Sequence, residues 1–193
     1  MTALGVFWGI FMLTVLLGAG MGLGRLFRAQ LGETSTNTVL MNTGRTSIPY
    51  KGMPTGRAWN LENDDVEAVK KLPEVKYATG MVWANQFYAS HGDRKGEYYV
   101  MGHMPDYQKI NPEKLIYGRY INDLDMERKR KVCLIGTQIW KDLFPGGEDP
   151  TGKTILLQGS QFTVVGVLKR QSNMMTFSDV ERTIILPATL VQQ

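Results

Sequence analysis

The longest apolar run of the chain lies at its beginning. Residues 3 to 24 contain no charged side chain, and Thr14 is the only ordinary polar residue among them. At about 1.5 Å of rise per residue, a helix of this length spans roughly 30 Å, the thickness of the hydrocarbon core of a bilayer. The pattern predicts a transmembrane helix that continues beyond the bilayer and ends near Gly32.

Two other interpretations of this run are open. A cleaved signal peptide is disfavoured because the run lacks a basic n-region, exceeds the usual apolar length of about 7 to 15 residues, and shows no convincing cleavage site before Arg25. A buried core helix is disfavoured by the length of the run.

Glycines recur within this segment at a spacing of four residues. The pairs are Gly5 and Gly9, Gly18 and Gly22, and Gly20 and Gly24. Such spacing leaves a smooth groove on a membrane helix, along which another helix can approach closely. We expect these six glycines to provide membrane-helix packing surfaces.

The remainder of the chain alternates irregularly between strand-like and helix-like patterns. A short strand is expected over residues 36 to 44. Asn63 is expected to cap a helix whose first turn is acidic, with Val66, Val69 and Leu72 on its apolar face and Pro73 at its end. Further elements are expected as follows: strands within 75 to 104, a helical turn at 105 to 110, a strand at 132 to 136, a helix at 137 to 144, a hairpin over 154 to 168 that turns at Gly159-Ser160, and a strand at 183 to 190.

This order predicts an α+β fold with two parts. Residues 1 to 31 form the transmembrane helix and its extension. Residues 32 to 193 form a mixed α/β domain, which we expect to be incomplete at its C-terminus.

Charge is distributed unevenly along the chain. No Lys, Arg, Asp or Glu precedes Arg25, whereas the later part resembles a soluble protein. A net charge of +4, without a basic stripe interleaved with aromatics, gives no indication of nucleic-acid binding. The densest basic run, residues 127 to 131, is typical of a solvated loop before a strand.

Few residues of the chain are candidates for a catalytic or metal-binding site. The single cysteine, Cys133, excludes an internal disulfide and lies in an apolar run typical of a buried thiol. His91 and His103 occur in unrelated contexts, and Asp123 and Asp125 precede a strand where carboxylates are usually solvated. We therefore expect no catalytic site, no metal site and no cofactor.

A match to the P-loop pattern runs from Gly147 to Thr154, with Gly152 and Lys153 in place. A working P-loop follows a buried strand and opens a helix. Here a helical pattern precedes the loop, a hairpin pattern follows it, and Pro150 has no N–H to donate. The match is interpreted as a surface connection.

Four segments together resemble the extracytoplasmic core domain of MacB/FtsX-type ABC transporter permeases. A glycine-rich first membrane helix leads the domain. Residues 61 to 82 resemble the family's short helix with an LP-x-V turn, and residues 98 to 110 its V-x-G-x-x-P-x-Y segment. Residues 118 to 125 resemble its GR-x-aromatic box. Residues 131 to 168, with DP-x-GK in the loop and VVGV in the hairpin, are the most specific part.

The resemblance implies a permease subunit of the bacterial cytoplasmic membrane rather than an enzyme. Its partners would be an ABC ATPase subunit or domain, a second permease copy, membrane lipid and other periplasmic proteins. Residues after about 30 would lie outside the cytoplasm. Arg25 and Arg28 by themselves favour the opposite orientation.

Two other functions are open. A membrane-anchored extracytoplasmic binding module would use the first helix only as an anchor. A nucleotide-binding protein would use the P-loop match.

Overall fold

The computed structural model describes residues 2–31, 38–170 and 179–192, with the side chains of residues 2 and 26 to 31 excepted. These residues fall into two compact units. One is the N-terminal helix, and the other comprises residues 38–170 and 179–192.

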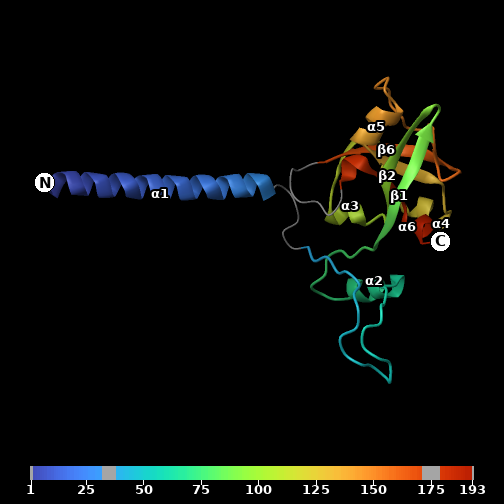
Figure 1. The fold of residues 1–193 in the computed structure, drawn as a ribbon, viewed down its shortest axis with the longest axis horizontal. Helices are drawn as coiled ribbons and strands as arrows, with labels where there is room; N and C mark the ends of the chain where they lie inside the picture. The colour runs from blue at the N-terminus through green and yellow to red at the C-terminus, as the bar shows by residue number, and fades with distance from the viewer. Residues whose placement is uncertain (1, 32–37, 171–178, 193) are drawn as a thin grey trace. The chain divides into compact units, whose positions relative to one another are not determined.

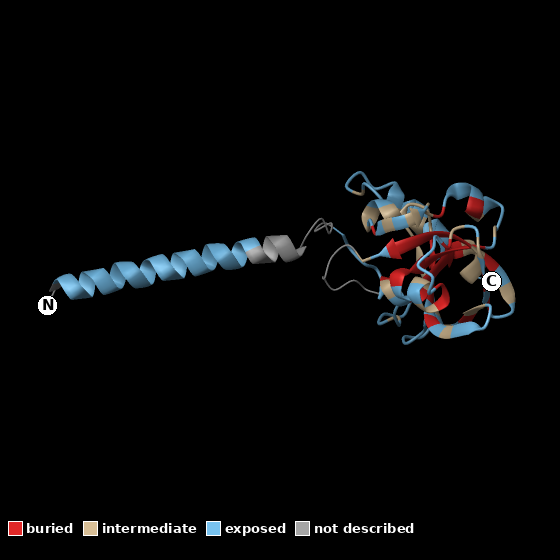
Figure 2. Cartoon of the chain, turned by 90° about the horizontal axis from the view of Figure 1, so that it is seen from above, coloured by how far each residue is buried: buried red, intermediate tan, exposed pale blue. Residues whose placement is uncertain are grey.

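The N-terminal helix α1 runs from Thr2 to Leu31, and the predicted end near Gly32 lies outside the described residues. Its residues 3 to 25 are exposed along the whole length (Figure 2). The Thr14 hydroxyl donates a hydrogen bond to the Ile10 carbonyl at 2.8 Å, so this polar side chain is satisfied within the helix. By length and composition, α1 can cross a membrane.

The second unit is built from short helices and a sheet (Figure 1). Its helices are α2 (Asn63–Lys70), α3 (Tyr107–Ile110), α4 (Asp123–Glu127), α5 (Thr137–Leu143), α6 (Ala188–Val191) and the 3-10 helix η1 (Val180–Arg182). Its strands are β1 (Met81–His91), β2 (Arg94–His103), β3 (Lys114–Gly118), β4 (Val132–Gly136), β5 (Thr154–Leu157), β6 (Ser160–Lys169) and β7 (Thr183–Pro187).

The sheet has the strand order β3-β6-β4-β7-β2-β1-β5 and curls back on itself, because β5 also pairs with β6. Strands β4 and β6, and β2 and β7, pair in parallel, and the other pairs are antiparallel. β6 pairs with β5 near its start and with β3 near its end. This places β3 at a free edge of the sheet.

Apolar side chains pack on both faces of the central strands. On β4, Cys133 and Ile135 belong to one core cluster, together with Ile139 and Leu143 of α5. Leu134 points to the other face, where it packs in a second cluster. Successive strand residues face opposite sides, so a continuous apolar run is required at this strand. Figure 2 shows this concentration of buried residues in the sheet.

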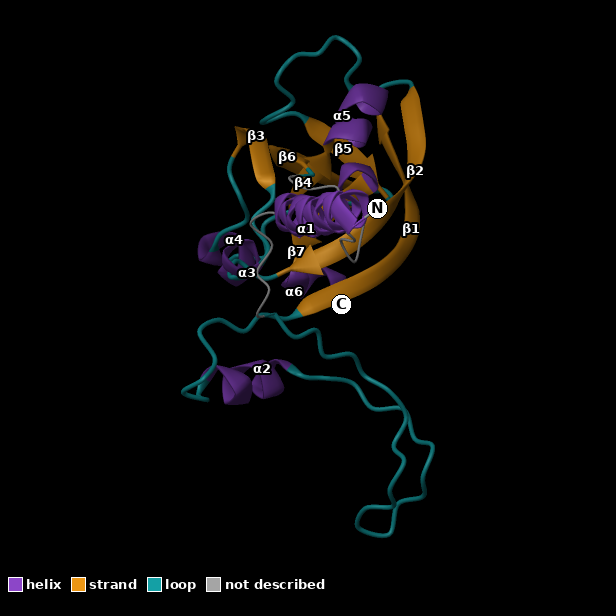
Figure 3. Cartoon of the chain, turned by 90° about the vertical axis from the view of Figure 1, so that its left-hand side faces the viewer, coloured by secondary structure: helices purple, strands orange, loops and turns teal. Residues whose placement is uncertain are grey.

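The expected strand over residues 36 to 44 is wrong where the structure describes it. Residues 38 to 44 have no strand conformation, and the nearest pairing is an isolated bridge between Arg45 and Ala58. A strand needs a neighbouring strand for its backbone N–H and C=O groups, and the described residues 39 to 44 belong to no such ladder. Residues 38 to 62 instead extend away from the sheet as a loop (Figure 3).

The helix expected at residue 63 forms, with shifted ends. Its N-cap is Glu62 rather than Asn63. It ends at Lys70, so Leu72 lies outside it and is exposed, whereas Val66 and Val69 are half-buried as the apolar face requires.

The C-terminal elements differ from expectation by a few residues. The hairpin turns at Gln158-Gly159 rather than Gly159-Ser160, and both turn residues have positive φ, as in a type I′ turn. The last strand ends at Pro187, because proline has no N–H to continue the ladder, and residues 188 to 191 form α6.

Candidate functional site

The six glycines of α1 lie on two faces of the helix. At roughly 100° per residue, Gly5, Gly9, Gly20 and Gly24 fall within an arc of about 100°, and Gly18 and Gly22 fall on the other side. A Cβ atom added at any of these glycines would meet nothing within 4 Å in the helix. The structure leaves both faces open at these positions, and packing of another membrane helix along them stays a prediction.

Toward the C-terminal end of the longer glycine face, Leu16, Leu17 and Met21 are near neighbours of Gly20 and Gly24, with Arg25 next to them. Apart from Arg25, these side chains are apolar and exposed.

In the second unit, Gly118 ends β3 and directs the chain sharply past β6. Its φ is +76°, and a Cβ atom there would lie 2.0 Å from the Val165 carbonyl oxygen. Only glycine fits this close approach. The next residue, Arg119, donates its backbone N–H to the same Val165 oxygen at 2.8 Å, which sets the position from which its side chain extends.

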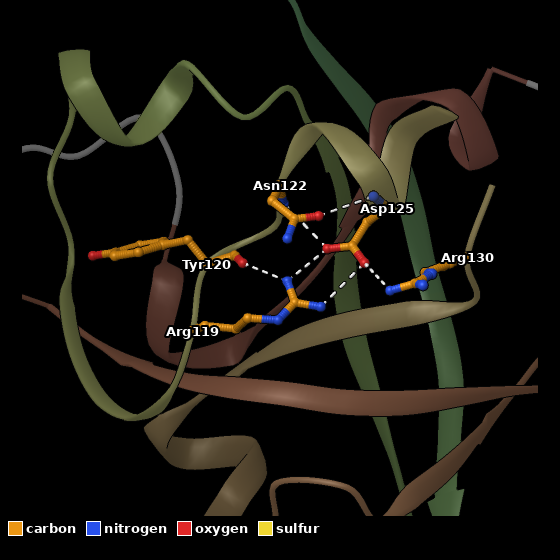
Figure 4. Close-up of polar contacts among 5 residues, drawn as sticks. All are labelled: Arg119, Tyr120, Asn122, Asp125 and Arg130. Carbon is orange, nitrogen blue, oxygen red and sulfur yellow. Dashed lines mark hydrogen bonds and ion pairs between the residues drawn. The ribbon is translucent and has the colours of Figure 1, made fainter. Parts of the chain in front are cut away.

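The Arg119 side chain binds Asp125 through both ends of its guanidinium. Its Nη1 lies 2.6 Å from Asp125 Oδ2, and its Nη2 lies 3.1 Å from Oδ1 (Figure 4). Arg130 Nη1 lies 3.7 Å from Oδ1 on the other side. The Asp125 side chain is fully buried, whereas the two arginines remain about 40% exposed (42% and 40%).

Asn122 completes this group, which we call the Asp125 cluster: Arg119, Asn122, Asp125 and Arg130. Asn122 Oδ1 accepts a hydrogen bond from the Asp125 N–H at 3.0 Å, and the Asn122 N–H donates to Asp125 Oδ2 at 3.1 Å. This reciprocal capping box begins α4. The cluster therefore ties the end of β3, the helix α4 and the approach to β4 into one rigid connection.

The electrostatics of the cluster favour the ionised carboxylate. Burial by itself would raise the pKa of Asp125, but the hydrogen bond from Arg119, the capping bond from Asn122 and the charge of Arg130 together lower it. The pKa of Arg119 is raised, mainly by its hydrogen bond to Asp125. The donors of the cluster are directed at Asp125, so the arrangement is suited to holding a backbone turn.

The expectation that Asp125 is solvated is wrong. Asp123 is exposed as expected, whereas Asp125, two residues later, points inward from the first turn of α4. The basic run 127 to 131 is in part a partner of this carboxylate through Arg130. A sequence signal existed in Asn122-x-x-Asp125, which fits a capping box.

The other sequence candidates lie apart from one another. Cys133 is fully buried, as predicted. His91 ends β1, whereas His103 pairs with Met81 at the opposite end of the β1–β2 hairpin, so the two histidines do not meet. Within the described ranges, no group of three or more His, Cys, Asp or Glu residues could hold a metal ion.

The P-loop match forms the expected surface connection between the helix α5 and the strand β5. The backbone N–H groups of Gly152 and Lys153 donate to the carbonyls of Val164 and Pro150, at 2.8 Å and 3.0 Å. The Lys153 ammonium pairs with Glu148. Of the amides that would hold a phosphate in a P-loop, that of Gly152 thus binds the hairpin and that of Lys153 closes a turn within the loop.

Comparison with known families decides the assignment. The model of the MacB-like periplasmic core domain matches residues 1–193. The chain belongs to this family. The match covers the helix α1 as well as the α+β unit.

Curated relatives of this MacB-like chain are longer proteins. The pyoverdine export ATP-binding/permease protein PvdT of Pseudomonas aeruginosa is 28% identical over 97% of this chain and 27% of its own length. The macrolide export ATP-binding/permease protein MacB of Rhodospirillum rubrum is 24% identical over 98% of this chain and 28% of its own length. The chain therefore spans less than a third of these relatives.

Solved structures share the fold. The periplasmic region of MacB from Actinobacillus actinomycetemcomitans superposes with a TM-score of 0.59 and 20% identity, over 76% of this chain and 64% of that one. The extracellular domain of the transporter YknZ from Gram-positive bacteria gives a TM-score of 0.58 and 19% identity, over 68% and 65%.

Proposed function

We propose that this chain is part of the permease of a MacB/FtsX-type ABC transporter, comprising a membrane helix and the adjoining part of its extracytoplasmic domain. The observation that carries the proposal is the family match over residues 1–193, combined with a helix long and apolar enough to cross a membrane. In this assignment residues 1 to 31 are the membrane helix with its extension, and residues 32 to 193 belong to the outer domain.

The chain contributes mechanical coupling. ATP hydrolysis by a cytoplasmic ATPase subunit or domain shifts the membrane helices, and the shift moves the outer domain as a rigid body. The unbroken α1, from Thr2 to Leu31, and the continuous sheet within the second unit support this role. The outer motion then serves export or mechanotransmission to a periplasmic partner.

The glycine faces of α1 provide the membrane contacts of this assembly. Two smooth faces allow the helix to pack against another membrane helix of the permease and against a second permease copy, with lipid along the rest. The names of the relatives, for pyoverdine and macrolide export, make small-molecule export one candidate activity.

The sheet unit lies on the extracytoplasmic side of the bacterial inner membrane in this proposal. Arg25 and Arg28 weigh locally for the opposite side, but two arginines on one flank do not decide orientation. The family's domain is periplasmic by description, which outweighs this local cue.

Maleimide labelling tests the orientation, because the only native thiol is protected. Cys133 is fully buried, and burial raises the pKa of its thiol, so it presents little reactive thiolate. We expect Tyr88→Cys, at a position 67% exposed on β1, to react with a membrane-impermeant maleimide in cells whose inner membrane is intact. The wild-type chain is the control.

Labelling of Tyr88→Cys only after the inner membrane is broken would refute the extracytoplasmic placement.

The gene sequence downstream of Gln193 distinguishes a permease from a membrane-anchored binding module. Three further apolar spans support the permease, and a stop codon there supports an anchored binding module.

A further inference from the structure

A small cavity lies beside the end of β2, away from the Asp125 cluster. His103, Tyr107, Asn111 and Glu113 contribute the polar part of its wall, and apolar residues such as Leu134 and Leu168 close the rest. About 20 Å³ of its volume is open to the centre of a water molecule. A single water needs about 10 to 15 Å³ by this measure, whereas small-molecule sites have volumes of roughly 300 to 1,000 Å³. The cavity therefore fits one water and no metabolite.

One wall of the cavity presents a buried nitrogen. His103 is only 7% exposed, and its Nε2 has no hydrogen-bond partner among the described residues. The ring stacks on Tyr107 with centroids 3.8 Å apart, which fixes its orientation. Burial lowers the pKa of His103 to about 3, so the ring is neutral and one of its nitrogens is an acceptor. A buried polar atom of this kind is costly unless it is bonded.

On the opposite wall, both hydrogens of the Asn111 side-chain amide are used. Asn111 Nδ2 donates to the Tyr107 hydroxyl oxygen at 3.1 Å and to Glu113 Oε1 at 3.3 Å. The Tyr120 hydroxyl donates to the Glu113 carbonyl. Glu113 is itself 7% exposed, and burial raises the pKa of its carboxyl group, whose oxygens keep lone pairs that can accept a hydrogen bond. With the ring proton of His103 on Nδ1, Nε2 is also an acceptor, and one water molecule carries a hydrogen for each of the two.

We propose that a single water molecule binds in this cavity and bridges His103 Nε2 to the carboxylate of Glu113. The water donates one hydrogen to each acceptor. It thereby links the end of β2 to the segment that precedes β3, and α3, which carries Tyr107, covers it. This site is independent of the transport function proposed above.

Water–protein NMR on the full chain in detergent micelles tests the site. The sequence has only His91 and His103, so ring-labelled histidine gives two sets of carbon-bound protons. We expect the His103 ring protons to show a cross peak at the water frequency with the sign of a long-lived bound water. His91, at an exposed strand end, should show only the sign of fast-exchanging surface water.

Three matched samples distinguish the explanations. Tyr107→Phe removes the nearby hydroxyl, so persistence of the cross peak there excludes magnetisation relayed through that group. Glu113→Met removes the second acceptor and should abolish the cross peak. Dialysis against EDTA should leave it unchanged, since the ligand is water. The proposal is wrong if the His103 ring protons of the wild type show no cross peak from a long-lived water. It is also wrong if that cross peak disappears in Tyr107→Phe or after dialysis against EDTA. The wild-type measurement tests the proposal even if a variant fails to fold.

Discussion

At the scale of single residues, Asp125 carries the most interactions of any side chain in the connection from β3 to β4. Two arginines and a reciprocal Asn122 cap converge on a carboxylate that has no exposed surface. A buried charge is tolerable only when it is paired and hydrogen-bonded. Removal of the carboxylate therefore takes away the shared acceptor of the two arginines and the half of the capping box that accepts from the Asn122 N–H.

We expect Asp125→Ala to lower the free energy of unfolding of the outer domain by roughly 3 kcal/mol, near the lower end for a broken buried pair, because both arginines keep access to water. Asp123→Ala is the matched control. It removes an exposed carboxylate from the same helical turn and should cost less than about 1 kcal/mol. Denaturant unfolding of the chain in detergent measures both. Equal losses in the two variants would contradict the assigned role.

The pH dependence provides a second readout for the same residue. Because the folded-state pKa of Asp125 is lowered, its stabilisation is present above the unfolded value of about 3.9 and is lost as the pH falls through the folded value. Wild-type stability should therefore decline at acid pH more steeply than that of Asp125→Ala. Parallel curves for the two proteins would show that Asp125 is not ionised in the folded state.

Single residues were predictable where local pattern decides their environment. Cys133 lies in an apolar strand and is buried as predicted. The sequence does not distinguish the environment of Asp123 from that of Asp125. The turn of α4 exposes Asp123 and buries Asp125, where Arg119, positioned by Gly118, binds its carboxylate. Gly118 is required by a carbonyl that lies almost 50 residues later in the chain, at Val165, and no local pattern reveals such an approach.

At the scale of elements, the apolar composition of α1 is enough to predict a helix that can span a membrane. Its described residues 3 to 25 are exposed, so its apolar surface is matched to lipid and to other membrane helices rather than to a core of its own. The longer glycine face, which includes Gly20 and Gly24, is the part of this surface that we expect to contact another helix.

We expect Gly20→Ile to weaken association of α1 with its partner helix by at least severalfold, because the branched side chain fills the groove that permits close approach. Ala19→Ile adds comparable bulk on neither glycine face and should leave association unchanged. Crosslinking yield or energy transfer between labelled copies of the complete permease in membranes measures both. Equal effects of the two substitutions would count against the glycine faces as packing sites.

Elements with strong periodicity or a dedicated turn were predictable from the sequence. The helix α5, the hairpin β5–β6 and the strand β4 form as their patterns predicted. The predicted strand at residues 36 to 44 fails over its described part because strand formation depends on a neighbour, which local sequence does not show. The helix α4 was missed because five residues give no helical period, and its capping box is the only signal.

At the scale of the whole molecule, the arrangement of the strands in the sheet is not visible in the sequence of any single element. No local pattern predicts that β5 pairs with both β1 and β6 and so curls the sheet. A curled sheet with two apolar clusters moves as one body, since packed interiors transmit displacement rather than absorb it. In the proposed function, such a body receives motion through its connection to the membrane helix.

Transmission through α1 should therefore depend on an unbroken helix beyond the bilayer. Leu26 lies inside α1, where proline removes a backbone hydrogen bond and clashes with the preceding turn, at a cost of about 3 kcal/mol. We expect Leu26→Pro in the complete transporter to leave ATP hydrolysis intact and to abolish transport or partner activation. Leu26→Ala, which preserves the helix, is the control. A hinge at this position would absorb the displacement before it reached the sheet, so the proline variant should not transport. If the proline and alanine variants transport equally well, the motion of the outer domain does not depend on a rigid helix.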